Sequence, residues 1–403
     1  MKYFPIPVAL LEIGKPLPVD VWSSNGNLLL RKGQPVTSEE HREKLHAHHA
    51  SSTLADAVAW QRAYERMVHS MLQQGMDVEE VARLPMPSEI RASDYVEGQQ
   101  VRGGWLDLQE VLRGILYQGG LAINPLQRLA GIEKKALELL TADPDDSLFS
   151  LFQALADNTR GYCATHALLC AVVSIMTAAK LGISNAQSHA LFAAALTMNI
   201  GMAREQDSMS LQSLPPTPWQ RQLIEDHPQK SLEILTGFGV DNPEQLDIVR
   251  WHHAADSVEA LGPTKACREL LVMVDGFIAR MASRKTRAPI SPVKAVRDMV
   301  LGAQGQAIGV GSAMAQAVGF YPPGTYVRLV NKEVAVSIQR GARANTPWVI
   351  SIIDKDGIPV VSSQCKDTSQ PAFTIEAPVS FQDVRISVSA ERVRKARNTI
   401  PRR

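Results

Sequence analysis

This chain of 403 residues has few cysteines, few aromatic residues and almost no net charge. Four cysteines without a C-x-x-C pair are too few for a disulfide framework, and they fit a reducing compartment. Lysine and arginine number 42 against 41 aspartates and glutamates, so the net charge of +1 makes nucleic acid an unexpected partner. Hydrophobic residues make up 45% and charged residues 21%, which excludes global disorder and fibrous classes.

Long apolar runs are missing as well. The longest, Ala167–Ala179 and Ala190–Met202, fall short of the roughly 18 residues that a membrane span needs. The first residues, MKYFPIPVALLEIGK, contain two early prolines and lack the apolar core and cleavage site of a signal peptide. We therefore expect a cytoplasmic protein without a membrane span.

The length predicts several domains, because single hydrophobic cores stop growing at roughly 250 to 300 residues. The pattern predicts a mostly α fold, in which an all-helical domain is flanked by a small N-terminal β element and a C-terminal antiparallel β module. The expected segments are a β-hairpin plus helix module at 1–53, a helical connector at 54–146, a helical domain at 147–319, and a β module with a basic tail at 320–403.

Local signals support these segments. Asn25-Gly26 between two apolar runs predicts a hairpin, and the spacing of Thr37 and Glu40 predicts a helix through 39–49. Further helix starts are indicated by Ser184 with Gln187 and by three cap residues that precede proline: Thr217-Pro218, Asn242-Pro243 and Ser291-Pro292.

The pattern of the C-terminal segment predicts β-strands. Five runs rich in β-branched residues predict strands at 325–330, 334–339, 348–354, 373–378 and 384–389. The last thirteen residues hold six basic residues: Arg392, Arg394, Lys395, Arg397, Arg402 and Arg403. A solvated tail and a binding segment for an anionic partner are both compatible with this composition.

Several polar residues of the helical domain interrupt apolar patterns. Asp275 lies within LLVMVDGFIARM, where a buried carboxylate needs a partner or a cation. His252 and His253 are adjacent at the end of a predicted helix, His166 lies on an apolar helix, and His227 precedes a proline. The alternative is that the histidines are hydrogen-bonded core residues, and that Asp275 faces solvent or pairs with Arg280.

Together, the order of these residues resembles the HD-GYP branch of the HD-domain metallohydrolases over residues 147–319. The resemblance implies an HD-type helical domain. It assigns metal-ligand roles to five residues: His166, His227, His252, His253 and Asp275. The resemblance also extends to the His227-Pro228 element and to an Arg-rich turn at 283–296 after Asp275. Active members of that family hold two or three Fe or Mn ions, which activate a hydroxide that attacks a phosphodiester of cyclic di-GMP.

The chain also departs from the family pattern. The family's His-Asp-x-Gly-Lys reads Met198-Asn199-Ile200-Gly201-Met202 here, so a ligand His, a bridging Asp and a Lys are replaced. Thioether and amide groups are poor substitutes, because hard divalent ions prefer imidazole and carboxylate. Tyr162 stands where some members have Glu, and the Gly-Tyr-Pro signature is absent from 254–263.

We therefore expect a catalytically degenerate signalling protein that binds cyclic di-GMP or another signalling protein. Its expected cofactor is one divalent Fe or Mn ion, or none. The alternative is an active metal-dependent phosphodiesterase with a reduced site, in which Asn199 or Asp256 supplies an additional ligand. A helical scaffold that binds no nucleotide is a third hypothesis, and a homo-oligomer is left open.

Overall fold

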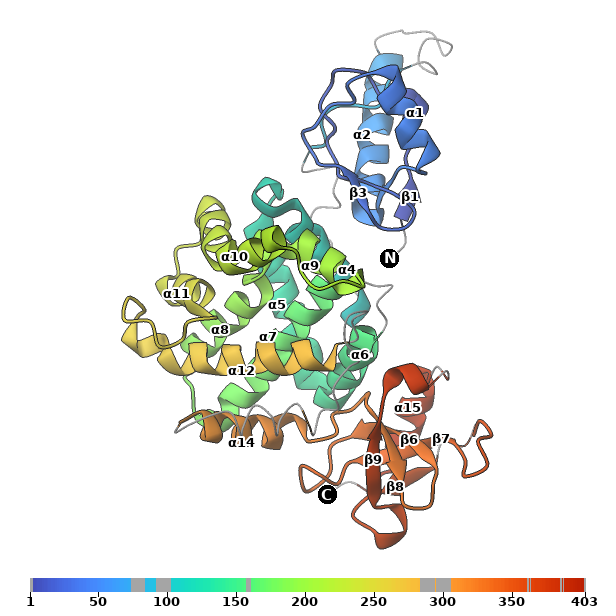
Figure 1. Ribbon diagram of the computed structural model, residues 1–403, viewed down its shortest axis with the longest axis vertical. Coiled ribbons are helices and arrows are strands. Elements are labelled where there is room, and N and C mark those ends of the chain that lie inside the picture. The colour runs from blue at the N-terminus through green and yellow to red at the C-terminus, as the bar shows by residue number, and fades with distance from the viewer. Residues whose placement is uncertain are drawn as a thin grey trace. The chain divides into compact units, whose positions relative to one another are not determined.

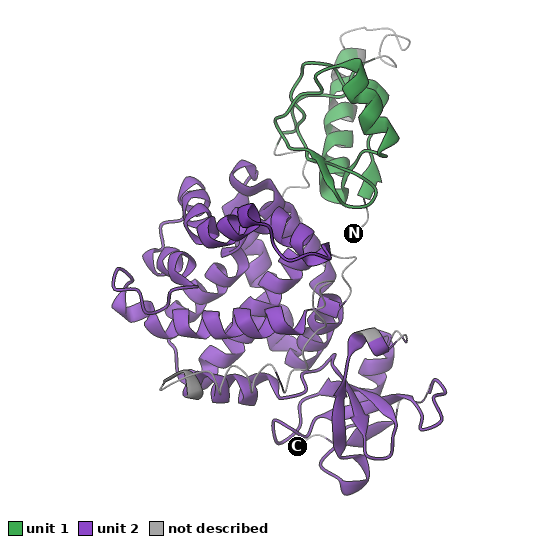
Figure 2. Cartoon of the chain, in the orientation of Figure 1, with its two compact units in different colours: residues 1–102 green, residues 103–403 purple. Residues whose placement is uncertain are grey.

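The computed structural model describes residues 3–73, 84–91, 103–156, 161–282, 294, 306–360, 362, 364–384, 386 and 388–401. The chain forms two compact units, residues 1–102 and 103–403 (Figure 2). Most of the described structure is helical, with one small antiparallel sheet in each unit. The predicted fold class, mostly α with an N-terminal and a C-terminal β element, is confirmed. The four expected segment boundaries stay predictions.

The first unit is built on a four-stranded sheet with the order β1-β4-β2-β3. Its elements are β1 Tyr3–Pro5, η1 Val8–Leu10, β2 Val21–Trp22, β3 Leu28–Leu30, α1 Glu39–Ala47, β4 Ser51–Thr53 and α2 Leu54–Gln73. The antiparallel pairing of β2 with β3 confirms the predicted hairpin. Helix α1 is capped one residue later than expected, because the side chain of Ser38, and not that of Thr37, accepts from the His41 N–H.

The second unit contains the helical domain (Figure 1). Its helices are α4 Trp105–Gln118, η3 Gly119–Leu121, α5 Pro125–Ala142, α6 Pro144–Ala156, α7 Tyr162–Leu181, α8 Asn185–Thr197, η5 Ile200–Met202, α9 Ala203–Leu211, α10 Pro218–Gly237, α11 Pro243–Trp251, η6 Gly262–Thr264, α12 Lys265–Met281 and α14 Gln306–Val318.

The helix starts follow the capping signals. Ser184 caps α8, Thr217 forms a full capping box with Gln220 at α10, and Asn242 caps α11. Each side-chain oxygen accepts from a backbone N–H that the first turn leaves without an intrahelical partner. The predicted start at Ser291-Pro292 and most of the Arg-rich turn lie outside the described residues.

Helix α7 is the central element of the domain and contacts α4, α6, α8, α9, α12 and α14 (Figure 1). It is also, among the described residues, the one helix long and apolar enough to cross a membrane. Of its apolar window, 83% is buried inside the protein. A helix that is apolar on all sides is typical of a domain core as well as of a membrane span.

The C-terminal part of the second unit is a five-stranded antiparallel sheet with the order β8-β7-β6-β5-β9. Its strands are β5 Tyr326–Leu329, β6 Val334–Gln339, β7 Trp348–Ile353, β8 Cys365–Asp367 and β9 Ile375–Val379. Four predicted strands are confirmed, and β8 was not predicted. The strand predicted at 384–389 is wrong for its described residues, Val384, Ile386, Val388 and Ser389, which have no regular structure. Its apolar side chains at 384, 386 and 388 pack on the sheet core instead.

Part of the expected basic tail is helix α15, Ala390–Arg397. The guanidinium of Arg397 donates to the carbonyl of Ile338 at 2.6 Å and to Asp143 Oδ2 at 3.1 Å. Arg392 donates to the carbonyl of Ser351 at 2.9 Å. Two of the six basic residues therefore hold the sheet and its neighbours together, while Arg402 and Arg403 lie outside the described residues.

The sheet docks against helix α6 through close backbone contacts. Gln153 Nε2 donates to the carbonyl of Gly324 at 2.6 Å, and Arg340 Nε pairs with Asp145 Oδ1 at 2.7 Å. Gly324 has φ of +96°, and a Cβ there would lie 2.9 Å from the Phe149 carbonyl oxygen. The position therefore needs glycine for both its conformation and its packing.

Replacing Gly324 tests this docking contact. We expect Gly324→Ala to destabilise the protein by about 2 to 4 kcal/mol, because left-handed backbone strain adds to a steric clash with α6. Gly357→Ala is the matched control, since Gly357 has φ of +84° and nothing within 4 Å of the added Cβ. It should lose only about 1 to 2 kcal/mol in urea denaturation. Equal losses in both variants would contradict the clash.

Candidate metal centre

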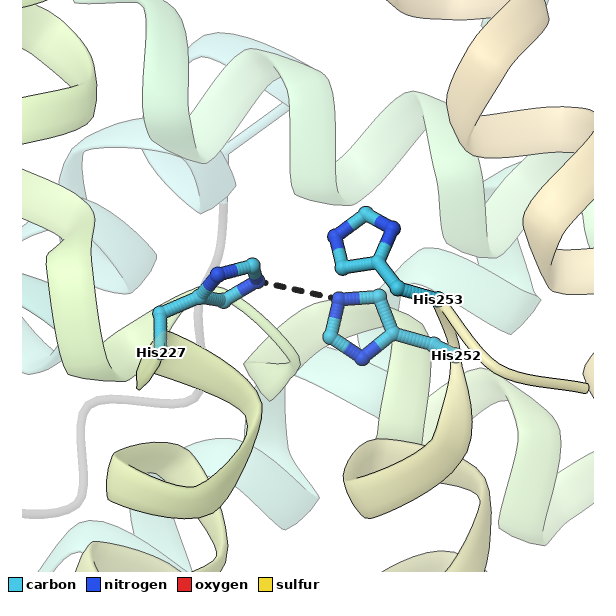
Figure 3. Close-up of side chains that lie close together, drawn as sticks. All are labelled: His227, His252 and His253. Atoms are coloured by element: carbon cyan, nitrogen blue, oxygen red, sulfur yellow. Dashed lines mark hydrogen bonds between the residues drawn. The ribbon is translucent and has the colours of Figure 1, made fainter. Parts of the chain in front are cut away.

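Two histidines of the second unit face each other across the gap between α10 and α11 (Figure 3). His227 lies within α10, and its Nδ1 donates to the carbonyl of Ile224 at 2.5 Å. That carbonyl is available because Pro228, four residues later, has no N–H to donate to it. The His-Pro dipeptide thus fixes the ring orientation of His227 from within its own helix.

His252 is held in the same way at the end of α11. It is the C-cap residue, and its Nδ1 donates to the carbonyl of Val249 at 2.6 Å. The last carbonyls of a helix have no intrahelical donor, so the imidazole satisfies one of them. Both rings are completely buried.

The two Nε2 atoms of His227 and His252 lie 3.0 Å apart. The two nitrogens are within hydrogen-bond distance (Figure 3). When both rings are neutral and each Nδ1 carries the donated proton, however, both Nε2 atoms have lone pairs, and these repel each other. A cation between them would remove that repulsion. Burial, outweighing the backbone hydrogen bond, lowers the pKa of His227 to about 4. Burial, followed by the charges of His253 and His227, lowers the pKa of His252 to about 3. These lowered pKa values favour neutral rings at neutral pH.

His253 completes the first group, and its ligand atom lies within 4.8 Å of those of His227 and His252. Its ring centroid is 4.2 Å from that of His252 and 5.1 Å from that of His227 (Figure 3). Unlike the other two rings it is exposed. The group is therefore buried on the side of the helices and open to solvent at His253.

A second group lies on α7 and α12. His166 Nε2 and Asp275 Oδ1 are 2.7 Å apart, and the Sγ atom of Cys170 lies 3.4 Å from the same nitrogen. The hydroxyl of Tyr162 is 2.9 Å from His166 Nδ1, one helical turn earlier. Asp275 neither faces away from the core nor pairs with Arg280, which donates to the carbonyl of Gly276.

The two groups share one electrostatic environment. Burial by itself would raise the pKa of Asp275. The hydrogen bond from His166 and the charges of His166, His252 and His253 hold that pKa below its ordinary value. The negative charge of Asp275 in turn acts on the pKa of both His227 and His252. The negative charge of Asp275 thus interacts with four imidazoles, of which His166 is in direct contact, and the side chain of Asp275 is 21% exposed.

This donor set fits a divalent transition metal. Imidazole with carboxylate suits Fe, Mn and Zn. Two imidazole nitrogens 3.0 Å apart are close enough to bind one ion whose bonds to nitrogen are about 2.1 Å long. The hydrogen bonds from Nδ1 to carbonyls are those that usually orient metal-binding histidines. If an ion were bound, it would be held by His227, His252 and His253, with His166 and Asp275 beside them.

The neutral residues of the 198–202 segment lie against the same turn of α10. Ser231 Oγ donates to the carbonyl of Met198 at 2.7 Å and accepts from the Gly201 N–H at 3.0 Å. Met198 and Asn199 are both buried. Glycine is needed at 201, because a Cβ there would lie 2.9 Å from the His227 carbonyl oxygen.

The loop after the double histidine is held by a buried ion pair. Arg268 Nη1 lies 2.6 Å from Asp247 Oδ2, and the same guanidinium donates to the carbonyls of Ala255 and Leu261. Asp256, which the alternative hypothesis offers as an additional ligand, instead pairs with Lys265 at 3.0 Å and is 83% exposed. Its carboxylate is therefore engaged outside the histidine group.

Asp207 fixes the start of the helix that carries His166. Gly161, the N-cap residue of α7, offers no side chain, and Asp207 Oδ1 accepts from the Cys163 N–H at 2.5 Å. Asp207 is itself held by the Tyr117 hydroxyl and by Arg113 Nε at 3.4 Å. A carboxylate at a helix N-terminus also interacts favourably with the helix dipole.

The structure brings the five predicted residues into these two groups, and their role as metal ligands stays a prediction. Sequence reasoning missed Cys170, which belongs to the second group. Cys170 lies four residues after His166, a spacing that places both on one helix face.

No family model and no curated protein matches this chain. Among solved structures, a HDG"Y"P protein from Bdellovibrio bacteriovorus matches with 16% sequence identity and a TM-score of 0.40. The match covers 78% of this chain and 98% of that chain. A similarity of this size adds nothing to the site, whose geometry is given by the contacts of this chain.

The buried histidines predict a loss of stability in acid. Their pKa of 6.5 in the unfolded chain falls to about 4 and about 3 on folding, so the unfolded state binds more protons below pH 6.5. Stability of the chelator-treated protein should therefore fall as the pH drops from 6.5 towards 4, by about 1.4 kcal/mol per pH unit for each histidine. Urea denaturation from pH 7 to 5 measures this slope. It should largely disappear in the His227→Gln/His252→Gln double variant, and an unchanged slope there would contradict the assignment.

Removing the charge of Asp207 should destabilise the N-terminal turn of α7. We expect Asp207→Asn to destabilise the protein by about 2 to 3 kcal/mol, because it disturbs a buried ion pair and a charged helix cap together. Asp226→Asn is the control, since Asp226 accepts from Gln222 on the exposed surface of α10. Thermal denaturation of both variants checks this. A loss no greater than that of Asp226→Asn would show that Asp207 does not hold the helix start.

Proposed function

We propose that the second unit contains a catalytically degenerate HD-GYP-like domain that binds one divalent Fe or Mn ion and acts in signalling by binding. The observation that carries this proposal is the opposition of His227 and His252, whose Nε2 atoms lie 3.0 Å apart while both Nδ1 atoms donate to carbonyls. Such an arrangement is unfavourable without a cation and favourable with one.

The charge balance of the site supports binding over hydrolysis. Paired-metal hydrolysis uses carboxylates that bridge the ions and offset their charge. Asp275 is the carboxylate whose charge acts on both His227 and His252, while Asn199 is neutral and Asp256 is paired with Lys265. One ion is therefore easier to accommodate than two.

The connection to cyclic di-GMP rests on the resemblance of residues 147–319 to the HD-GYP pattern. Under this proposal the partner is a nucleotide or a signalling protein of such a pathway, and the chain works in the cytoplasm. The docking of the C-terminal sheet on α6 makes that sheet a fixed part of the second unit, and so a surface that such a partner could recognise.

Metal content is the first test. We expect protein purified anaerobically with Fe(II) or Mn(II) to hold about one ion per chain by elemental analysis. We also expect it to produce no linear product from cyclic di-GMP by chromatography. Asp275→Ala should lower the metal occupancy at least tenfold, because it removes the carboxylate beside the ion. Asp256→Asn, three residues beyond the double histidine, is the matched control and should retain the metal.

Two results would overturn the proposal in different ways. Turnover of cyclic di-GMP that disappears in Asp275→Ala would make the protein an active phosphodiesterase with a reduced site. Absence of bound metal in the folded wild-type protein would leave the histidines as hydrogen-bonded core residues of a scaffold. Metal-dependent unfolding transitions distinguish the second case, since an ion that binds only the folded state raises its stability.

A further inference from the structure

His166, Cys170 and Asp275 form a compact group of metal-binding side chains. Cys170 lies four residues after His166 on α7, and its Sγ atom is 3.4 Å from His166 Nε2. The same nitrogen is 2.7 Å from Asp275 Oδ1 on α12. All three ligand atoms lie within 4.8 Å of one another. They are therefore close enough to bind one ion whose bonds are about 2.1 Å long to nitrogen and about 2.3 Å long to sulfur.

The thiol of Cys170 contacts an imidazole nitrogen, whereas comparable groups contact the backbone. Thr177 on the same helix donates from Oγ1 to the carbonyl of Val173, four residues earlier, at 2.7 Å. The Sγ atom of Cys365 donates to the carbonyl of Ala396 at 2.9 Å. The Sγ atom of Cys170 instead lies beside the nitrogen that Asp275 also contacts, which is where a second ligand of the same ion belongs.

The ring of His166 is supported on its other side. The hydroxyl of Tyr162 is 2.9 Å from Nδ1. When Nε2 coordinates an ion, Nδ1 carries the ring proton and donates to this hydroxyl oxygen, as the second nitrogen of metal-binding histidines usually does to a nearby acceptor. Tyr162 and Cys170 lie four residues before and after His166, so one face of α7 carries two ligands and the group that orients one of them.

The charges of this group match a divalent ion that prefers sulfur. A thiolate at Cys170 and the carboxylate of Asp275 together offset the charge of one such ion, and this balance matters because His166 and Cys170 are completely buried. Thiolate with imidazole favours Zn(II), whereas Mn(II) prefers oxygen ligands. Three protein ligands leave the fourth position of a tetrahedral ion to water, and the side chain of Asp275 is 21% exposed to solvent.

We infer that His166, Cys170 and Asp275 form a binding site for Zn(II) that is distinct from the group of three histidines at α10 and α11. The ion binds Sγ, Nε2 and a carboxylate oxygen, and the protons of the thiol and of Nε2 are released to solvent. Because its ligands come from α7 and α12, the ion links these two helices. The inference does not rest on the Fe or Mn ion of the proposed function.

Cobalt(II) tests this site, because it replaces Zn(II) and a thiolate ligand gives it a charge-transfer band in the near ultraviolet. We expect this band when the reduced, chelator-treated full chain is titrated with Co(II). Cys170→Ser should abolish the band and weaken Zn(II) binding at least tenfold, because it removes the thiolate. Cys170→Ala gives the same comparison without a hydroxyl. Cys163→Ser is the matched control and should keep the band, since Cys163 is also completely buried on α7 but lies outside the group.

The variant His252→Gln separates this site from the group of three histidines. It removes one of those imidazoles and leaves His166, Cys170 and Asp275 unchanged, so the Co(II) band should persist. In this variant Zn(II) should also raise the thermal unfolding temperature, because an ion that binds only the folded state stabilises it. The rise should disappear when Cys170→Ser is added to His252→Gln.

The possible failures are distinguishable. Absence of the band in the folded wild-type protein would overturn the inference, and so would a band that remains in Cys170→Ser. Loss of the band in His252→Gln would also overturn it, because the thiolate-bound ion would then need the three histidines. A chain that shows the band but binds neither Fe(II) nor Mn(II) overturns the proposed function alone.

Discussion

The candidate site depends on where two buried imidazoles place their protons. His227 and His252 each donate from Nδ1 to a backbone carbonyl, so neither neutral ring can donate to the other at Nε2. The lone pairs that remain are directed at each other within a buried space, and a cation between them would make this arrangement favourable. Two ordinary features of helices produce it. A proline leaves the Ile224 carbonyl without its donor, and a helix end leaves the Val249 carbonyl without one.

The rest of the second unit holds these groups in place. Helix α7 carries His166 through the centre of the domain, and its first turn is capped by Asp207. Ser231 bonds the 198–202 segment to the turn of α10 that carries His227. The neutral side chains of that segment leave Asp275 as the carboxylate of the site. The site therefore has its side chains held by hydrogen bonds, and it has less negative charge than paired-metal hydrolysis uses.

The sequence was informative where a signal is local. Cap residues before proline indicated the starts of α10 and α11, and Asn25-Gly26 indicated the first hairpin, because these signals act on the backbone beside them. The strand predicted at 384–389 was wrong. Alternating apolar residues indicate that one face of a segment is buried, but they do not show that its backbone pairs with another strand. The sequence of the short strand β8 has no alternating apolar pattern that would predict a strand. Helix α15 was not predicted, because its segment was interpreted as a basic tail.

By itself the sequence determined a mostly α chain with two small sheets, and five residues able to bind a metal. It could do so because helix periodicity and capping are local, and because polar residues in apolar runs stand out. Only the tertiary structure decided that His166 pairs with Asp275, 109 positions away, and that Asp256 is engaged by Lys265. It also decided which nitrogen of each buried imidazole faces the other ring. These properties depend on distances between separate helices, which no local pattern of residues contains.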